Sequence, residues 1–225
     1  MLKAQLHIHS HEDPRDRGGY TAKDVIDKAS ELNFDVIAFT FHDILFYPQE
    51  IQEYAKSKDI LLIPGIEKTI EKSHVLILGL TELPELNKIE DLKKLPEEAL
   101  IIAAHPFLPL LQSLKEKLLE NIDLFHGIEH HFFYRKYINF NKKAIKIAKK
   151  HNKTIVGTSD VHDLKCFSLT YSLIDSKKNK EDVINAIKRN KIKVVTKPAP
   201  FSMFYPLPLK IFSKKIFYKI FKKNH

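Results

Sequence analysis

The feature that most constrains this 225-residue chain is a repeated alternation of short apolar runs with segments of helical periodicity. The apolar runs are rich in Ile, Val and Leu, which is typical of buried parallel strands, and the segments between them fit covering helices. We therefore predict an α/β fold with one core. The expected strands lie near residues 3–9, 34–41, 60–66, 74–79, 100–104, 124–130, 153–158 and 191–196.

Three of the intervening segments carry clear helix signals. Thr21 followed by Asp24 is typical of a capped helix start, and apolar residues follow at helical spacing. Segments 141–150 and 181–189 show a similar apolar stripe. Each of the three helices precedes a predicted strand, so the order of elements favours successive β/α units.

The formal charge of +9 is concentrated at the end of the chain. Beyond Pro200 there are six lysines and no acidic residue, whereas the rest of the chain has 31 basic and 28 acidic residues. A body this close to neutral argues against a folded surface built to neutralise a polyanion.

The composition also limits where the protein is expected to work. No apolar stretch reaches the roughly 20 residues of a membrane-spanning helix, and the first residues lack the apolar core of a signal peptide. We therefore expect a cytoplasmic protein without a transmembrane segment. The single cysteine, Cys166, excludes an internal disulfide framework.

Histidines and carboxylates follow several predicted strands at the point where each strand ends. In a β/α barrel the loops at the carboxyl ends of the strands meet at one face, where the chemistry takes place. Side chains two apart on a strand share a face, so a His-x-His or Asp-x-His pair can bind one ion. The residues concerned are His7, His9, His42, Asp43, Glu67, His105, Asp160 and His162.

These residue types are the ligands expected for Zn, Mn or Fe. Taken singly, each pair or histidine is more often structural than metal-binding. Their place at the ends of different strands favours a shared metal centre instead. Such a centre would hold a hydroxide that is a strong nucleophile at neutral pH.

The residues lie in blocks that together resemble the PHP family, named for polymerase and histidinol phosphatase. The blocks occur in order over about residues 1–196: Leu6-His7-Ile8-His9-Ser10, Ala38-Phe39-Thr40-Phe41-His42-Asp43, Pro64-Gly65-Ile66-Glu67, His74-Val75-Leu76, Ala104-His105-Pro106 and Gly157-Thr158-Ser159-Asp160-Val161-His162. The resemblance implies a distorted (β/α)7 barrel in which two or three divalent ions, Zn, Mn or Fe, hydrolyse phosphate esters.

The resemblance also implies a set of ligands. The hydroxide would be bound by metal ions whose ligands include His7, His9, Glu67 and Asp160. The full set of implied ligand positions is His7, His9, His42, Glu67, His74, His105, Asp160 and His162.

A ninth ligand is expected in the loop after the first block. The Ser-Asp-Gly common in the family is absent, and we favour Asp13 over the neighbouring His11, Glu12 and Asp16.

Two other positions set conditions on the site. Phe41 stands where the family commonly has an Asp, so hydrogen-bonding support for His42 has to come from elsewhere. His74 begins its apolar run, and it reaches the site only if the chain turns back between Lys68 and Ser73.

Arginines on the expected catalytic face are candidate phosphate-binding residues. Arg15 and Arg17 lie in the loop after the first strand, and Arg135 is a third candidate. The alternative for the loop arginines is an ion pair with Asp13 or Asp16. Near the 124–130 strand, Glu129 with His130 or His131 is a candidate for orienting ligands or transferring protons.

The domain limits follow from these patterns. We expect a PHP-like domain at 1–198 and an aromatic, lysine-rich extension at 199–225. The extension has apolar residues at helical spacing from Leu209 to Ile220, with lysines largely opposite, which predicts a basic amphipathic helix. It would pack on the barrel or form a homo-oligomer, or else contact an anionic membrane or nucleic acid.

The sequence thus predicts a metal-dependent phosphoesterase acting on a small phosphomonoester or phosphodiester. One alternative is a nuclease with the same chemistry, which the lysine-rich tail favours and the near-neutral body opposes. The other is a metal-free RNA-binding scaffold resembling the barrel subunit of ribonuclease P. The retained His7, His9, Glu67, Asp160 and His162 argue against a scaffold.

Overall fold

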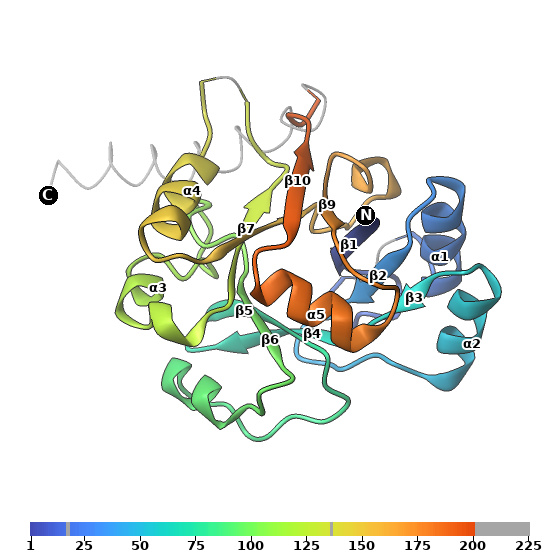
Figure 1. Cartoon of the computed structure of the whole chain (residues 1–225), viewed down its shortest axis with the longest axis horizontal. Helices are drawn as coiled ribbons and strands as arrows, with labels where there is room; N and C mark the ends of the chain where they lie inside the picture. The colour runs from blue at the N-terminus through green and yellow to red at the C-terminus, as the bar shows by residue number, and fades with distance from the viewer. Residues whose placement is uncertain (17–18, 136, 201–225) are drawn as a thin grey trace, which may run out of the picture.

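Two five-stranded β-sheets with helices on their outer faces form the framework of the protein (Figure 1). The structure is a computed structural model and describes residues 1–16, 19–135 and 137–200. The strands are β1 (Leu2–Ile8), β2 (Val36–Phe39), β3 (Leu61–Leu62), β4 (Gly65–Ile70), β5 (Ser73–Leu78), β6 (Leu100–Ala103), β7 (Gly127–His131), β8 (Thr154–Thr158), β9 (Thr170–Ile174) and β10 (Ile192–Thr196). The helices are α1 (Ala22–Glu31), α2 (Gln49–Ser57), α3 (Glu116–Glu120), α4 (Asn141–Lys150) and α5 (Lys180–Lys188), with short 3₁₀ helices η1 (Ile89–Lys94), η2 (Ile122–Leu124) and η3 (Leu164–Cys166).

Both sheets mix parallel and antiparallel pairing. The first has the order β10-β9-β1-β2-β3, in which β1 to β3 are parallel and β9 is antiparallel to both neighbours. The second has the order β4-β5-β6-β7-β8, with antiparallel pairing from β4 to β6 and parallel pairing from β6 to β8.

The predicted α/β class is confirmed, but the described strands do not pair into a closed (β/α)7 barrel. β3 is only two residues long, and Pro64, which has no N–H to donate, separates it from β4. This proline also divides the single strand predicted at 60–66. At the other seam, the Ser172 hydroxyl bonds to both the N–H and the C=O of Gly157, so a side chain joins β8 to β9.

The helix signals in the sequence were largely sound. The Thr21–Asp24 capping box starts α1, and α4 and α5 match the predicted segments within one residue. The prediction missed β9, α2 and the short α3. α2 follows Pro48, which makes no side-chain cap, and has only Ile51 and Ala55 buried, so its sequence signal is weak.

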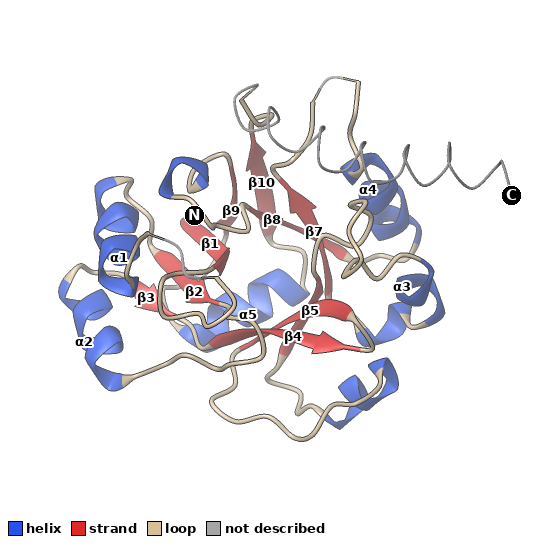
Figure 2. Cartoon of the chain, turned by 180° about the vertical axis from the view of Figure 1, so that it is seen from behind, coloured by secondary structure: helices blue, strands red, loops and turns tan. Residues whose placement is uncertain are grey.

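One apolar core lies between the two sheets. Inward-facing side chains of both sheets meet one face of α5, which Figure 2 shows lying between them. α1 and α2 pack on the outer face of the first sheet, and α3 and α4 on that of the second. The shared core includes Leu6, Ala38, Leu76, Ile102, Val156, Ile174, Val183 and Ile187.

Two isolated parallel bridges join the sheets next to the predicted site. Ile8 pairs with Val161, whose backbone bonds to His7 and His9, and His42 pairs with Glu67. The ends of β1 and β2 are therefore fixed against residues of the other sheet.

Two expectations concern features beyond this core. The amphipathic tail predicted at 199–225 lies almost wholly in residues 201–225, outside the described part of the chain. Among the described residues, no helix is both long and apolar enough to cross a bilayer.

The close approach of β8 to β9 predicts a stability effect. A Cβ added at Gly157 would lie 2.7 Å from Val194 Cγ1 and 2.8 Å from the backbone oxygen of Tyr171. We expect Gly157→Ala to lower the free energy of unfolding by about 1–3 kcal/mol, measured by urea denaturation. Gly19→Ala, where nothing lies within 4 Å of the added Cβ, is the matched control. Equal stability of the two variants would contradict the tight seam.

Candidate metal centre

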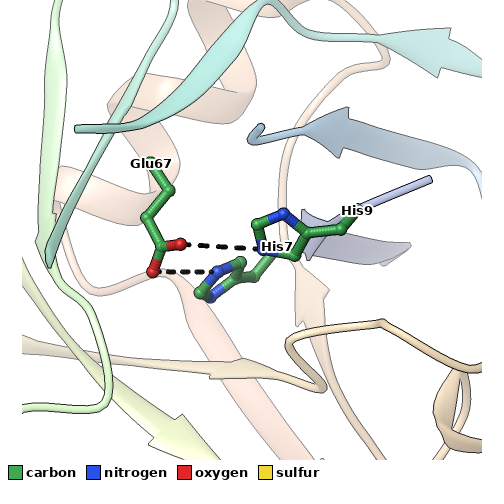
Figure 3. A group of neighbouring side chains, drawn as sticks. All are labelled: His7, His9 and Glu67. Atoms are coloured by element: carbon green, nitrogen blue, oxygen red, sulfur yellow. Dashed lines mark ion pairs between the residues drawn. The ribbon is translucent and has the colours of Figure 1, made fainter. Parts of the chain in front are cut away.

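The carboxylate of Glu67, on β4, lies at the centre of a group of histidines. Its side chain is only 1% exposed, and five imidazoles surround its two oxygens. Figure 3 shows His7 and His9, from the end of β1, pointing at this carboxylate. The nitrogens nearest Oε1 are His74 Nδ1 at 2.8 Å, His105 Nε2 at 3.2 Å and His7 Nε2 at 3.3 Å, and those nearest Oε2 are His42 Nε2 at 3.2 Å and His9 Nε2 at 3.7 Å.

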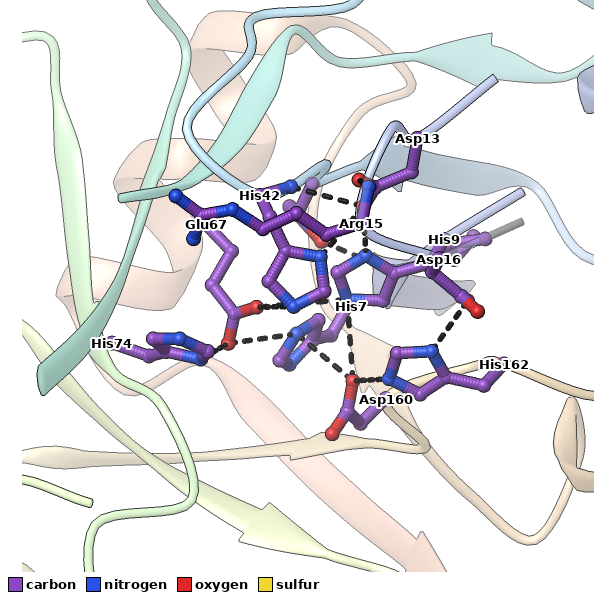
Figure 4. Close-up of polar contacts among 12 residues, drawn as sticks. His7, His9, Asp13, Arg15, Asp16, His42, Glu67, His74, Asp160 and His162 are labelled. Atoms are coloured by element: carbon purple, nitrogen blue, oxygen red, sulfur yellow. Dashed lines mark hydrogen bonds and ion pairs between the residues drawn. The ribbon is translucent and has the colours of Figure 1, made fainter. Parts of the chain in front are cut away.

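A second carboxylate, Asp160, faces the same histidines from the end of β8 (Figure 4). Its Oδ1 lies 3.1 Å from His7 Nε2, 3.3 Å from His9 Nε2 and 3.1 Å from His162 Nε2. Its Oδ2 lies 3.4 Å from His131 Nε2. The pairs His7/His9 and Asp160/His162 thus share one side, as their spacing in the sequence predicts.

A tight hairpin carries His74 to the site. β4 and β5 are joined by Glu71 and Lys72, which have φ of 47° and 67°. Two successive residues with positive φ are the mark of a turn whose twist matches the hairpin. His74 then lies opposite Thr69 across the hairpin, so the predicted reversal of the chain after Glu67 is confirmed.

Two site residues leave their strands through unusual backbone. His105, after β6, has φ of 27°, and Asp160, after β8, has φ of 42°. Positive φ is sterically costly for residues other than glycine, and such strain gathers at functional sites. Here the sharp exit turns both side chains into the centre.

Glu129, on β7, holds the outer side of His7. Its carboxylate lies 2.7 Å from His7 Nδ1 and also accepts hydrogen bonds from the backbone N–H of His105 and the Thr158 hydroxyl. With Nδ1 donating to Glu129, His7 presents Nε2 to Glu67 and Asp160. Glu129 is therefore placed as an orienting group, the role considered for it in the sequence.

The loop after β1 contains the candidates for a ninth ligand. Asp13 is fully buried and contacts His9 and His42, whereas the Asp16 carboxylate lies 2.5 Å from His162 Nδ1. Glu12 is turned away, and it accepts hydrogen bonds from the Ala22 N–H and the Ser10 hydroxyl. His11 is exposed.

Several buried ring nitrogens face carboxylate oxygens without a hydrogen bond. Within the described part of the chain, His7 Nε2, His9 Nε2 and Asp160 Oδ1 have no such partner. Buried polar atoms are normally paired, so a ring nitrogen that faces a carboxylate oxygen here needs a proton or a metal ion between the two atoms. Four overlapping triads could hold an ion: His7/His9/Glu67, His9/Asp13/His42, His9/Asp160/His162 and His42/Glu67/His74. This donor set fits Zn, Mn or Fe.

The carboxylates also control the protonation of the histidines. Burial acts to lower the pKa of His7, but Asp160, Glu129 and Glu67 outweigh it and raise that pKa well above 6.5. Burial likewise opposes protonation of His162, yet Asp160 and Asp16 raise its pKa to about 10.

The pKa of the Glu67 carboxyl shifts in the opposite direction, downward. Burial acts to raise the pKa of Glu67, but His7 and hydrogen bonds from His105 and His74 hold it well below its usual range. The buried carboxylate is therefore ionised at neutral pH.

Arg15 lies at the rim of this group. Its side chain is 54% exposed, with Nη2 2.7 Å from Asp43 Oδ2 and Nη1 donating to Thr69 Oγ1 at 3.1 Å. The alternative considered for Arg15, an ion pair with Asp13 or Asp16, is wrong, because the guanidinium pairs with Asp43, which follows β2 and lies beside Thr69. Arg135 follows β7 with a partly buried side chain, and Arg17 lies outside the described residues.

Solved structures with low sequence identity share this fold. PsfC from Pseudomonas syringae PB-5123 aligns with a TM-score of 0.61 at 13% identity, covering 87% of this chain and 91% of that one. A candidate metal-dependent phosphoesterase from Bifidobacterium adolescentis ATCC 15703 aligns at 0.54 with 15% identity, covering 71% and 87%. An amidohydrolase from Chromobacterium violaceum, solved with sulfate and no metal, aligns at 0.53 with 16% identity, again covering 71% and 87%.

Sequence comparison adds the family. Among proteins with curated descriptions, none matches this chain. The family model described as the PHP domain matches residues 5–167, well over half of the chain, and this segment contains every histidine and carboxylate placed around Glu67 and Asp160. The chain belongs to the PHP domain family.

Proposed function

We propose that this protein is a metal-dependent hydrolase of a small phosphomonoester or phosphodiester. The observation that carries the proposal is the set of buried imidazole nitrogens aimed at Glu67 and Asp160 without hydrogen bonds. Two or three Zn, Mn or Fe ions would satisfy those atoms. The names of two similar structures, a candidate phosphoesterase and an amidohydrolase, support hydrolysis, and the phosphate ester is part of the proposal.

The proposed ligands divide around Glu67. Its Oε1 faces His7, His74 and His105, whereas its Oε2 faces His9 and His42, so each oxygen can serve a different ion. Asp160 Oδ1 faces both His7 and His9, so it could complete the ligand set of either, and His162 with an acid of the loop after β1 could complete a third position. Eight ligands are proposed, His7, His9, His42, Glu67, His74, His105, Asp160 and His162, and Asp13 is the ninth ligand expected from the sequence.

Bound ions would supply a strongly nucleophilic water and neutralise charge on the phosphate oxygens. The chain's own residues would do the rest. Glu129 keeps His7 in one orientation, and Arg15, held by Asp43 and Thr69, presents its guanidinium at the rim to a phosphate. Arg17 and Arg135 remain proposed as further phosphate contacts.

The first prediction separates a metal ligand from a substrate contact. Glu67→Gln keeps the size but removes the charge that holds two cations together, so one ion should be lost and turnover should fall by at least about 100-fold. Arg15→Ala should keep its metal while kcat/KM falls about 10–100-fold, because a charged hydrogen bond is lost. Metal analysis and kinetics on phosphate esters measure both effects.

The control for charge is Glu71→Gln, an exposed position on the same hairpin. Full metal occupancy in Glu67→Gln would refute the bridging role. Metal loss in Arg15→Ala would show that this residue shapes the centre and does not merely contact substrate.

The second prediction concerns protons. His162, with a pKa of about 10, and His7 keep protons at pH 7 in the metal-free protein, whereas metal ligation requires neutral imidazole. Zinc binding near pH 7 should therefore release about one or two protons per chain. Calorimetric titration in buffers of different ionisation enthalpy counts them, and His162→Gln should release fewer.

The raised pKa of His162 also predicts how pH affects the stability of the metal-free protein. Because the folded pKa of His162 lies above its unfolded value of 6.5, its ion pairs stabilise the fold fully below pH 6.5. This stabilisation is lost as the pH rises through about 10. Thermal melts of metal-free protein should show a falling Tm over this window, and a constant Tm would contradict the assignment.

A further inference from the structure

No acidic residue immediately precedes His42, and Asp43, which follows it, is engaged by Arg15. The preceding residue, Phe41, is fully buried and packs against Phe39 and Phe46, with ring centroids 5.6 Å and 4.6 Å away. This ring cannot accept a hydrogen bond from an imidazole N–H. The orientation of His42 must therefore be set by a group from another segment.

Asp13 supplies that group. Its Oδ2 lies 2.8 Å from His42 Nδ1 and 3.0 Å from the backbone N of His42, which donates to it. The same oxygen lies 2.8 Å from His9 Nδ1, and Oδ1 accepts from the backbone N–H of Arg15 at 3.0 Å. Asp13 is fully buried, so protein donors take the place of water around its charge.

The two histidines present the same face to Asp13. Their rings stack with centroids 4.4 Å apart and an interplanar angle of 27°. Each ring has Nδ1 on the Asp13 side and Nε2 on the Glu67 side. An ionised carboxylate only accepts hydrogen bonds, so each 2.8 Å contact requires a proton on Nδ1, and in a neutral ring the lone pair is then on Nε2.

A cation at Asp13 Oδ2 fits this geometry poorly. The backbone N–H of His42 points at that oxygen and would be turned toward the positive charge. An ion there would also need deprotonated Nδ1 atoms, which lie on the side of the rings away from Glu67.

We infer that Asp13 is a positioning residue that fixes the tautomers of His9 and His42 together, and that it is not itself a ligand. The inference rests on the proposed metal-binding function and replaces the ninth ligand chosen from the sequence. One carboxylate then fixes the tautomers of two imidazoles that lie at the ends of the neighbouring strands β1 and β2. Removing it should therefore weaken every metal site that depends on either ring. Asp16, another acid of this loop, contacts His162 instead.

The decisive measurement is the tautomer itself. Nitrogen-15 spectra of histidine-labelled protein, loaded with zinc, should show a protonated Nδ1 in both His9 and His42, with signals assigned through His9→Gln and His42→Gln. Asp13→Ala should abolish this shared preference. A wild-type spectrum with metal-bound, unprotonated Nδ1 in either ring would overturn the inference.

Metal binding gives an independent readout. In Asp13→Asn, competition with a chelator should show affinity weakened about 10–100-fold, while the number of ions bound at saturating zinc stays that of wild type. If Asp13 were a ligand, the variant would instead bind one ion fewer at saturation. Glu12→Gln, which alters the neighbouring acid, is the matched control and should keep wild-type affinity.

Failure of the proposed function can be distinguished from failure of this inference. If wild-type protein binds no metal, the proposed hydrolase is wrong. The tautomers of His9 and His42 can still be read in metal-free protein, at a pH where imidazoles are neutral. Protonated Nδ1 atoms there would support the role of Asp13, and Nε2–H tautomers would refute it.

Discussion

The buried negative charge of Glu67 is the constraint on which the rest of the centre depends. A carboxylate removed from water is tolerated only when partners replace its hydration. The five imidazoles that do so come from the end of β1, the loop after β2, β5 and the loop after β6. Each of these segments has to keep its place for the charge to remain stable, so the centre and the packing of both sheets depend on each other.

Backbone bridges between the two sheets keep these segments in place. The bridge between His42 and Glu67 fixes one edge, and the bridge between Ile8 and Val161 fixes the other. Backbone bonds at these points restrict the site more than flexible loops alone would, and functional sites generally require positioning to within about 0.5 Å. The strained exits at His105 and Asp160 are held in the same framework.

Much of the centre could be predicted because its residues follow strands, and strand ends are visible in sequence. His7 and His9 needed only the alternation of a strand to share a side. The sheet arrangement was less accessible: β3 is too short to show its limits, and β9 buries the polar residues Thr170 and Ser172, so its inward positions carry little apolar signal. The Arg15–Asp43 pair and the contact of Asp13 with His42 join separate loops, and no local pattern reports such contacts.

Exposure is graded across the centre. The side chains of His7 and Glu67 are 0% and 1% exposed, Asp160 is 14% exposed and His162 is 45% exposed. His162 is the most exposed of these four side chains, so solvent reaches the group from its side. Ions held here would consequently differ in kinetic lability. One at His162 would exchange with solution first, and one deep between His7 and Glu67 would leave only after the outer ligands had opened.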